Sequence, residues 1–342
     1  VSENRADWLI SDVAIMAIGA ITVPAYTTNT VEDHLHIISD SGAKAALIST
    51  HKLAENFIPA AVDAGNIAFI ASMEPQPENQ QSSNIGFEAL TFDDLIARGS
   101  ARNESIAGHA TQWKRDDLAC IIYTSGTGGL PKGVMLHHGA ILHNCTGAHD
   151  ALLDLNLGDE VFLCFLPLSH SYEHSAGQFF PISIAAQIYY AEGLEKLASN
   201  MAEARPTIMT AVPRLYETMH QKITRGVEKQ GGMKERMFNA TRRLGAKRFN
   251  EPENLTIIER IADTLLDKLV RNKVRGRFGG RLKALVSGGA PLNPDIGLFF
   301  TSLGLRLLQG YGQTESAPVI SVNKPSNVKM HTVGTLMHDT EV

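Results

Sequence analysis

The chain has 342 residues, of which 44% are hydrophobic and 20% are charged, and its formal net charge is −5. That hydrophobic share can fill a sizeable core, and the length exceeds what one compact domain usually holds. A mildly acidic chain offers no electrostatic field that would attract nucleic acid, so we expect no nucleic-acid partner.

The three cysteines, Cys120, Cys145 and Cys164, are widely spaced and form no CxxC pair. An odd number of cysteines argues against a disulfide framework, so a reducing, cytoplasmic setting is the simplest expectation. The most apolar run, 162–168, has the length of a strand and is too short to span a bilayer.

The beginning of the chain predicts a helix. Asn4 can serve as its N-cap, and Asp7 then places an acid at the third helical position. The first residue is Val1 rather than Met, and the last ten residues resemble the middle of a sheet. We therefore expect a longer protein that continues beyond both ends.

Short apolar runs then alternate with amphipathic helical patterns along the chain. The predicted strands are 43–49, 118–123, 160–166, 207–213, 282–288 and 305–310. The predicted helices include 11–19, 53–63, 91–98, 136–153 and 195–204. These strands are apolar on both faces, as parallel strands covered by helices are, and the repeated alternation predicts an α/β fold.

A glycine-rich run, Tyr123–Gly133, follows the second of these strands directly. Its glycines let the backbone approach a ligand and turn N–H groups inward. Hydroxyl groups and one positive charge are added by Thr124, Ser125, Thr127 and Lys132. The combination suits a polyphosphate, whereas a flexible surface turn would explain glycine and serine but not the lysine and the three hydroxyls.

This run is not a Walker A motif, in which Gly-Lys is followed by Ser or Thr at the start of a helix. Here Pro131 precedes Lys132, and Gly133 follows it. An ordinary nucleotide phosphotransferase is therefore disfavoured.

Two histidines, His170 and His174, lie four residues apart in the run 166–174. Such spacing could place both on one helix as metal ligands, but no third ligand with zinc spacing lies nearby. For His174, an ordinary packed histidine is a fair alternative.

Two longer segments have a distinct composition. Residues 73–89 are polar and contain proline, which predicts an exposed loop, whereas 214–275 are charged and helical and predict a helical insertion. A basic cluster near its end comprises Arg271, Lys273, Arg275, Arg277, Arg281 and Lys283. We expect it to be a solvated surface, with a membrane contact as the alternative.

Two short runs near the C-terminus each follow a predicted strand. In Ser287–Leu292, Gly288 and Gly289 leave space for a planar group, although Pro291 and Asn293 also signal the start of a helix.

In Gln309–Glu315, Tyr311 can stack on a flat base, and Thr314 can donate to a phosphate. Glu315 offers the hard oxygen that Mg²⁺ prefers. Taken alone, this run could equally be a turn with an ordinary surface glutamate.

Together, these runs resemble the motifs of the adenylate-forming enzymes: acyl-CoA synthetases, luciferases and the adenylation domains of peptide synthetases. The run 123–133 is similar to their YTSGTTGxPKG loop, with Gly128 in place of the second Thr, and 309–315 is similar to YGxTE. The opening residues are also similar, so the resemblance covers essentially the whole chain.

The resemblance implies the large N-terminal domain of such an enzyme, with mostly parallel sheets flanked by helices. We expect one α/β subdomain at 1–165 with the phosphate loop and a second at 166–342 with the helical insertion, the C-terminal domain being absent. Counterparts of the family's ribose-binding aspartate and C-terminal lysine are not found, so we expect weak or no catalysis by this chain alone.

The resemblance also assigns site residues. It places ATP at Thr124, Ser125, Gly126, Thr127, Gly128, Gly129, Lys132, Gly288, Gly289, Ala290, Gln309, Gly310, Tyr311, Gly312 and Thr314. It assigns Mg²⁺ to Thr127 and Glu315, and the acyl substrate to His170, His174 and Gly289. Catalytic roles fall to Lys132, His170, Thr314 and Glu315.

The run LPLSHSYEH at 166–174, the run 204–219 and the insertion are similar to long-chain members of the family. This implies a ligase that converts a fatty acid into acyl-AMP and then acyl-CoA, using ATP, Mg²⁺ and coenzyme A. Activation of a short-chain, aryl or amino acid is an alternative, as is a non-catalytic nucleotide- or acyl-binding module. A homodimer and a contact with the inner face of a membrane also stay open.

Overall fold

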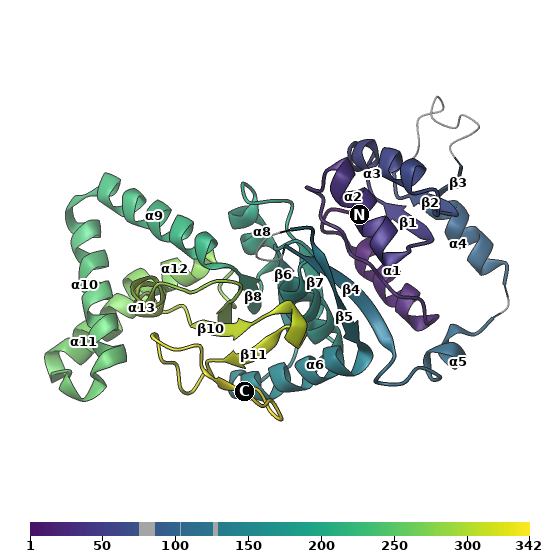
Figure 1. Ribbon diagram of the computed structural model, residues 1–342. Helices are drawn as coiled ribbons and strands as arrows, with labels where there is room; N and C mark the ends of the chain where they lie inside the picture. The colour runs from purple at the N-terminus through teal and green to yellow at the C-terminus, as the bar shows by residue number, and fades with distance from the viewer. Residues whose placement is uncertain (75–85, 103, 126–128) are drawn as a thin grey trace. The chain divides into compact units, whose positions relative to one another are not determined.

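The computed structural model describes residues 1–74, 86–102, 104–125 and 129–342. The chain forms two compact units (Figure 1). Unit 1 comprises Val1–Leu142 and Pro167–Ser171, and unit 2 comprises His143–Leu166 and Tyr172–Val342. Most of the loop predicted at 73–89 lies outside the described residues. Within the described residues, no helix combines the length and the apolar character needed to cross a membrane.

Unit 1 contains a three-stranded parallel sheet in the order β1-β2-β3. Its strands are β1 (Ala45–Ile48), β2 (Phe69–Ser72) and β3 (Glu88–Thr91). Its helices are α1 (Ala6–Ala17), α2 (Val31–Ser41), α3 (His51–Ala64), α4 (Phe92–Ser100) and α5 (Ile106–Ala110). Ile38, Ile48 and Phe57 are buried where α2 and α3 pack with the sheet.

Local sequence signals fix the ends of several helices. Helix α2 begins with a capping box between Thr30 and Asp33 and ends at Gly42, which is left-handed. The predicted cap of α1 is wrong: Arg5, not Asn4, occupies the N-cap position. Arg5 is extended, and its Nε donates to Asp7 Oδ2 at 2.9 Å, which engages the carboxylate that a capping box would use.

A separate antiparallel hairpin in unit 1 joins β4 (Leu118–Thr124) to β5 (Lys132–His137). The expectation that 118–123 is a parallel strand is therefore wrong. Both kinds of strand can be apolar on both faces, so the apolar run alone does not set the direction of pairing. In β5 the only buried side chain is Leu136, so its sequence carries no buried-strand pattern.

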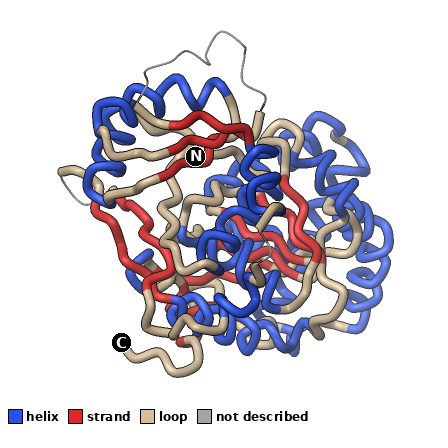
Figure 2. The backbone as a smooth tube through the Cα atoms, turned by 90° about the vertical axis from the view of Figure 1, so that its right-hand side faces the viewer, coloured by secondary structure: helices blue, strands red, loops and turns tan. Residues whose placement is uncertain are grey.

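Unit 2 is built on a seven-stranded sheet in the order β12-β11-β10-β9-β8-β6-β7. Strands β6 to β10 are parallel, and β11 and β12 are antiparallel additions. The strands are β6 (Val161–Cys164), β7 (Gln187–Tyr190), β8 (Ile208–Ala211), β9 (Ala284–Ser287), β10 (Leu307–Gly312), β11 (Val319–Val322) and β12 (Thr335–Leu336). Helices flank these strands (Figure 2).

The five parallel strands follow a flavodoxin-like order. Numbered along the chain from β6 to β10, their spatial order is 2-1-3-4-5. In such sheets the connections leave in opposite directions from two neighbouring strands, here β6 and β8, and ligands bind at the carboxyl ends beside this switch point.

Most residues of 214–275 lie in helices of unit 2, and the interpretation of this segment as an insertion stays a prediction. The helices are α6 (His138–Leu152, which begins in unit 1), α7 (Phe180–Ser183), α8 (Leu197–Ala204), α9 (Pro213–Gln230), α10 (Gly232–Asn250), α11 (Ile257–Leu266), α12 (Asn272–Arg277) and α13 (Pro294–Ser302). A π-helical turn, η5 (Asp267–Arg271), joins α11 to α12, and a second π-helix, η3 (Glu173–Phe179), precedes α7.

One member of the predicted solvated basic cluster is buried. Arg271 is 0% exposed, and its Nη2 donates to Asp263 Oδ1 at 2.6 Å and to Thr241 O at 3.2 Å. Its Nε donates to Ser302 O at 2.8 Å. The prediction is wrong for Arg271, because carbonyl groups and a carboxylate from three helices accept the hydrogen bonds that water would otherwise accept. Lys273, Arg277 and Arg281 of the same cluster are exposed.

Candidate functional site

The glycine-rich run connects the two strands of the hairpin in unit 1. Thr124 ends β4 and lies opposite Lys132, which begins β5 and is exposed. Ser125 is exposed, and Gly129 has φ +126°, a conformation that favours glycine. Gly126, Thr127 and Gly128 lie outside the described residues.

Two residues of α2 hold the base of this run. The hydroxyl of Tyr123 donates to Asp40 Oδ2 at 2.7 Å, and His36 Nε2 lies 2.7 Å from the carbonyl oxygen of Pro131. Burial raises the pKa of Tyr123 above its ordinary value, so the phenol stays a donor. Sequence reasoning missed His36 and Asp40; their only signal is the four-residue spacing that puts both on one face of α2.

Packing explains the last glycine of the run. A Cβ atom on Gly133 would lie 2.7 Å from Ile121 Cγ2 and 3.1 Å from Tyr123 Cζ. Gly133 of β5 is paired with Tyr123 of β4. A side chain at position 133 would therefore push the tyrosine ring away from Asp40.

In unit 2, the run Ser287–Leu292 leaves the carboxyl end of β9. Gly288 N donates to Ala211 O on the neighbouring strand at 3.2 Å, and Gly289 is left-handed with φ +79°. Gly289 and Ala290 are exposed. Asn293 caps α13 by accepting from Asp295 N at 2.9 Å, which confirms the helix start that the sequence predicts here.

Tyr172 connects the run 166–174 to this turn, and sequence reasoning missed it. A Cβ atom on Gly288 would lie 2.9 Å from Tyr172 Cζ, so the tyrosine ring covers the glycine. Its hydroxyl donates to Val286 O at 3.0 Å. The sequence offers no signal for this contact, because 114 residues separate the donor and acceptor.

The run Gln309–Glu315 covers the end of β10 and the turn that follows it. Gln309 and Gly310 lie within the strand, and Tyr311 is 51% exposed, which leaves its ring free to stack on a ligand. A Cβ atom on Gly312 would lie 2.0 Å from Pro318 O, so the tight return to β11 requires glycine. Thr314 and the exposed Glu315 lie in a 3₁₀ turn, η6 (Thr314–Ser316).

Two buried side chains hold this turn from different helices. Asn144 Nδ2 on α6 donates to Ser316 O at 3.0 Å, and its Oδ1 accepts from Val319 N at 2.9 Å. Ser175 Oγ on η3 donates to Ala317 O at 3.0 Å. Sequence reasoning missed both; a polar residue in the buried stripe of α6 is the only hint for Asn144.

A buried carboxyl group occupies the switch point between β6 and β8. Glu173 is 0% exposed, and its Oε2 accepts from Thr210 Oγ1 on β8 at 2.7 Å. Burial raises the pKa of Glu173 to about 7, although the hydrogen bond from Thr210 lowers it. A Cβ atom on Gly177 would lie 2.4 Å from Oε1, so glycine one helical turn later makes room for the carboxyl group.

The two histidines of the run 166–174 do not share a helix. His170 lies in the turn before the helix, in the part of the run that belongs to unit 1, and burial lowers its pKa. His174 lies on η3 in unit 2, is 0% exposed, and packs edge-on against Phe179 with 4.9 Å between ring centroids. His174 thus has the surroundings of a packed histidine.

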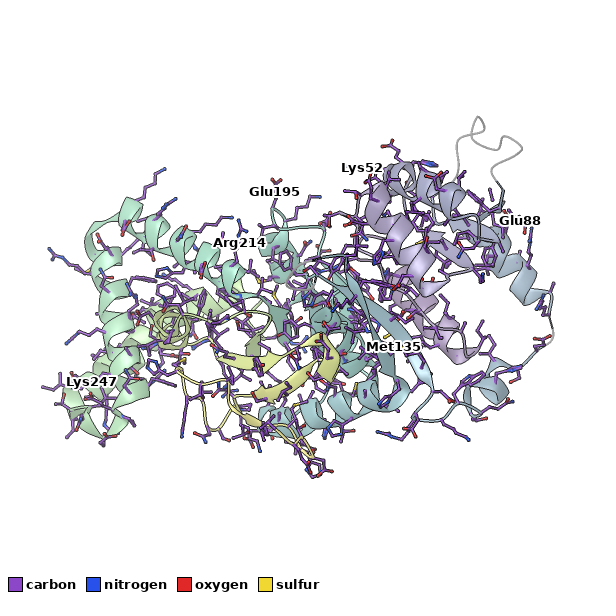
Figure 3. All side chains as sticks on the ribbon, in the orientation of Figure 1. Lys52, Glu88, Met135, Glu195, Arg214 and Lys247 are labelled. Carbon is purple, nitrogen blue, oxygen red and sulfur yellow. The ribbon has the colours of Figure 1, made fainter. Side chains whose placement is uncertain are left out.

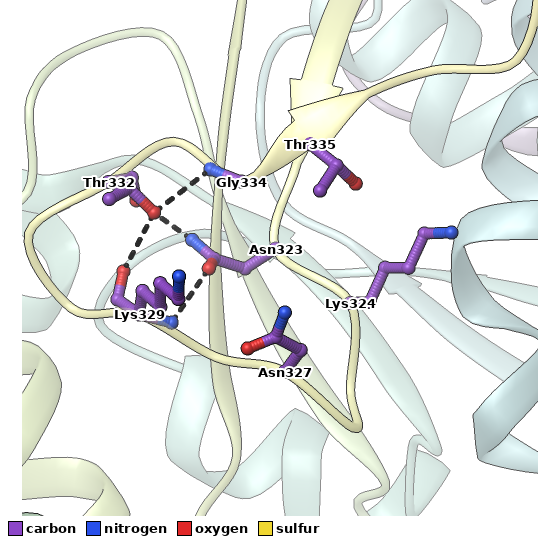
Figure 4. Close-up of a pocket in the computed structure, with 7 residues that line it drawn as sticks. All are labelled: Asn323, Lys324, Asn327, Lys329, Thr332, Gly334 and Thr335. Atoms are coloured by element: carbon purple, nitrogen blue, oxygen red, sulfur yellow. Dashed lines mark hydrogen bonds between the residues drawn. The ribbon is translucent and has the colours of Figure 1, made fainter.

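A small pocket of about 170 Å³ lies between β11 and β12 (Figure 4). Asn323 lines the pocket, and its side chain donates to Thr332 O at 2.8 Å and accepts from Lys329 N at 2.9 Å. None of the lining residues belongs to the predicted motifs, so this pocket is not the site that the motifs indicate. The glycine-rich run 123–133 lies in unit 1 and Glu315 lies in unit 2, and their approach to one another stays a prediction.

The model of the AMP-binding enzyme family matches residues 1–342. Peroxisomal long chain acyl-CoA synthetase 6 of Arabidopsis thaliana is 30% identical over 323 residues, which are 93% of this chain and 44% of that protein. A long-chain-fatty-acid–CoA ligase of Mycobacterium tuberculosis is 28% identical, over 97% of this chain and 54% of that protein. The chain thus spans about half the length of these relatives.

Solved structures show the same fold. The adenylation domain of a carboxylate reductase from Mycobacterium chelonae matches with a TM-score of 0.71 at 21% identity, over 94% of this chain and 48% of that chain. A benzoate CoA ligase from Burkholderia xenovorans LB400 matches with a TM-score of 0.68 at 21% identity, over 98% of this chain and 54% of that chain.

Proposed function

Because the chain belongs to the family of AMP-binding enzymes, we propose that the protein activates a carboxylic acid with ATP and passes the acyl group to coenzyme A. The observation that carries this proposal is the position of two motif runs. The runs 287–292 and 309–315 leave the carboxyl ends of the neighbouring parallel strands β9 and β10, where α/β sheets bind ligands.

The proposed reaction has two steps. A carboxylate oxygen bonds to the α-phosphorus of ATP while the bond to pyrophosphate breaks, which leaves acyl-AMP. The thiol sulfur of coenzyme A then bonds to the acyl carbon, AMP departs with the electron pair, and the thiol proton is released. An ionised carboxylate is already a nucleophile, so the protein has to position the reactants and offset charge on phosphate oxygens.

The proposal gives roles to residues of the predicted motifs. Thr124, Ser125 and Lys132 hold the outer phosphates with the amides of the loop, and Tyr311 stacks on the adenine beside Gly288–Ala290. We assign His170 to the acyl carboxylate, whereas His174, which is buried and packed against Phe179, is assigned no contact with the substrate.

The proposal includes a magnesium ion. Glu315 fits one, because its carboxylate is exposed on a turn that Asn144 fixes, and Mg²⁺ needs few protein oxygens when phosphates supply the rest. When bound, the ion would offset negative charge on the phosphates, held by Glu315 and Thr127.

A long-chain fatty acid is the substrate that we propose. Support comes from the relatives that are themselves named long-chain acyl-CoA synthetases. Another carboxylic acid is the second candidate, since the fold is shared with a benzoate CoA ligase and with an adenylation domain of a carboxylate reductase.

Because we expect weak or no catalysis by this chain alone, carboxylate-dependent exchange of labelled pyrophosphate into ATP by the full-length protein tests the first step. The assay should compare palmitate, acetate, benzoate and an amino acid, and the nucleotide product should be identified. We expect exchange with palmitate and AMP as the product. Exchange with benzoate alone would replace the substrate proposal, and ADP as the product would contradict the reaction itself.

Two substitutions test the residue roles. Lys132→Ala and Glu315→Ala should each lower the exchange rate about 100-fold or more, because each removes a fixed group that offsets developing charge. Lys52→Ala and Glu195→Ala, which change exposed residues outside the motifs, serve as matched controls (Figure 3). Near-wild-type exchange by the first pair would contradict the assignment.

A further inference from the structure

Positive charge is concentrated in one part of this acidic chain. Residues 213–281 hold 17 of the 31 Lys and Arg residues but only 8 of the 36 Asp and Glu residues. This segment therefore has a formal charge of +9, whereas the rest of the chain has −14. In unit 2 the segment forms α9 to α12, and α10 packs between α11 and α13, so α11 is an outer helix (Figure 1).

An aliphatic stripe runs along the outside of α11 and η5. Its members are Ile257, Ile258, Ile261, Leu265 and Leu269, with exposures of 77%, 79%, 59%, 55% and 50%. Steps of one, three, four and four residues place them on one helix face. Large aliphatic side chains grouped in this way on a surface mark an interaction site, whereas scattered ones do not.

The acidic residues of α11 and η5 are all held in ion pairs. Glu259 pairs with Lys247 of α10 at 2.8 Å, and Asp263 pairs with the buried Arg271 at 2.6 Å. Asp267 pairs with Arg275 at 2.7 Å. These contacts fix which face of the helix is internal, so the stripe is exposed by a defined orientation and not by a loosely attached helix.

The outer face consequently combines aliphatic side chains with positive charge. Lys268 and Lys273 are exposed on the same helical segment as the stripe, and each acidic residue of α11 and η5, namely Glu259, Asp263 and Asp267, is paired with a Lys or Arg side chain of the segment. An interfacial helix has this composition, in which aliphatic side chains enter the acyl region and lysines meet anionic headgroups.

We propose that this aliphatic stripe docks the protein on an anionic lipid bilayer, with the helix axis parallel to the membrane plane. A protein partner fits less well, because the stripe lacks the aromatic and arginine anchors that concentrate binding energy at protein interfaces. The charge of the segment is complementary to an anionic leaflet. This docking does not depend on which carboxylic acid the protein activates.

Vesicle flotation of the purified protein tests the proposal. Vesicles of phosphatidylcholine alone are compared with vesicles that also contain phosphatidylglycerol. Wild-type protein should float with the anionic vesicles, and added salt should weaken its partitioning. The double substitution Ile261→Gln and Leu265→Gln should lower the partition coefficient about tenfold or more. Lys268→Gln with Lys273→Gln should lower it about tenfold for anionic vesicles.

A matched control makes the same chemical change elsewhere. Val62 and Ile96 are 46% and 52% exposed on α3 and α4, so Val62→Gln with Ile96→Gln should float like wild type. Thermal unfolding should match for all variants, since every altered side chain is exposed. The proposal is overturned if the stripe variant floats like wild type or if no protein floats. It is also overturned if sedimentation velocity shows a dimer that the stripe variant abolishes, because a second copy would then cover the stripe.

Discussion

At the residue scale, the most unusual group is the carboxyl of Glu173. It is fully buried at the switch point of the sheet, where it accepts a hydrogen bond from the hydroxyl of Thr210. It also begins the π-helix η3, and π-helical turns occur often at functional sites. Burial disfavours the charged form, so the pKa of Glu173 is raised and its carboxyl group stays protonated to a higher pH than one in water.

This burial predicts a pH dependence. The pKa of Glu173 rises from 4.5 to about 7 on folding, so the folded state holds the proton more tightly between these values. The proton on Glu173 therefore contributes on the order of 3 kcal/mol to the free energy of unfolding. This contribution is fully present below pH 4.5 and is lost as the pH rises through about 7. Denaturant unfolding at pH 5 and pH 8 should show this loss in wild type.

Glu173→Gln, which imitates the neutral acid, should remove that loss. Glu195→Gln changes an exposed glutamate and should retain the wild-type pH profile. Identical profiles for wild type and Glu173→Gln would show that the carboxyl group does not titrate in this range.

At the element scale, the turn after β10 depends on its neighbours more than on its own sequence. Its 3₁₀ helix has three residues, and its carbonyl groups are paired by Asn144 and Ser175 from α6 and η3. A short turn of this kind keeps Glu315 in place only if those side chains are present.

Asn144→Ala tests this dependence. The change leaves Val319 N and Ser316 O without their side-chain partner, so it should lower the free energy of unfolding by about 1–3 kcal/mol. It should also slow pyrophosphate exchange about tenfold, with the larger effect on kcat, because it loosens the position of Glu315. Asn239→Ala, an exposed position on α10, should change neither quantity.

Elements with a clear local sequence pattern could be predicted from the sequence. Elements whose structure depends on contacts with residues far along the chain could not. Strands β6 and β8 are buried along their whole length, so their apolar runs identify them. Strand β7 alternates exposed with half-buried residues, and β12 has two residues, so neither gives a clear pattern. The motifs located the turns of the candidate site, but the supporting contacts of His36 and Asn144 reach across 95 and 172 residues.

At the scale of the whole molecule, the reactivity of the cysteines can report the unfolding of each unit. Cys120 lies in unit 1, and Cys145 and Cys164 lie in unit 2; all three are buried. Burial raises the pKa of Cys145 to about 11 and raises the pKa values of Cys120 and Cys164 as well. The thiolate that reacts with disulfide reagents is therefore scarce in the native protein.

The native protein should accordingly resist a thiol reagent at pH 8 and react at three thiols when it is unfolded. Under partly denaturing conditions, mass spectrometry of the labelled peptides would separate opening of unit 1 from opening of unit 2. Fast labelling of native Cys145 or Cys164 would contradict the packing described for unit 2.

The hairpin that bears the glycine-rich run has one more consequence. Since β5 and not a helix follows the run, the aligned peptide dipoles of a helix N-terminus are not available there to an anion. A bound polyphosphate would be retained by separable contacts, chiefly the ammonium group of Lys132. Contacts of this kind can break one after another. They would therefore suit an enzyme that releases a highly charged leaving group in every turnover.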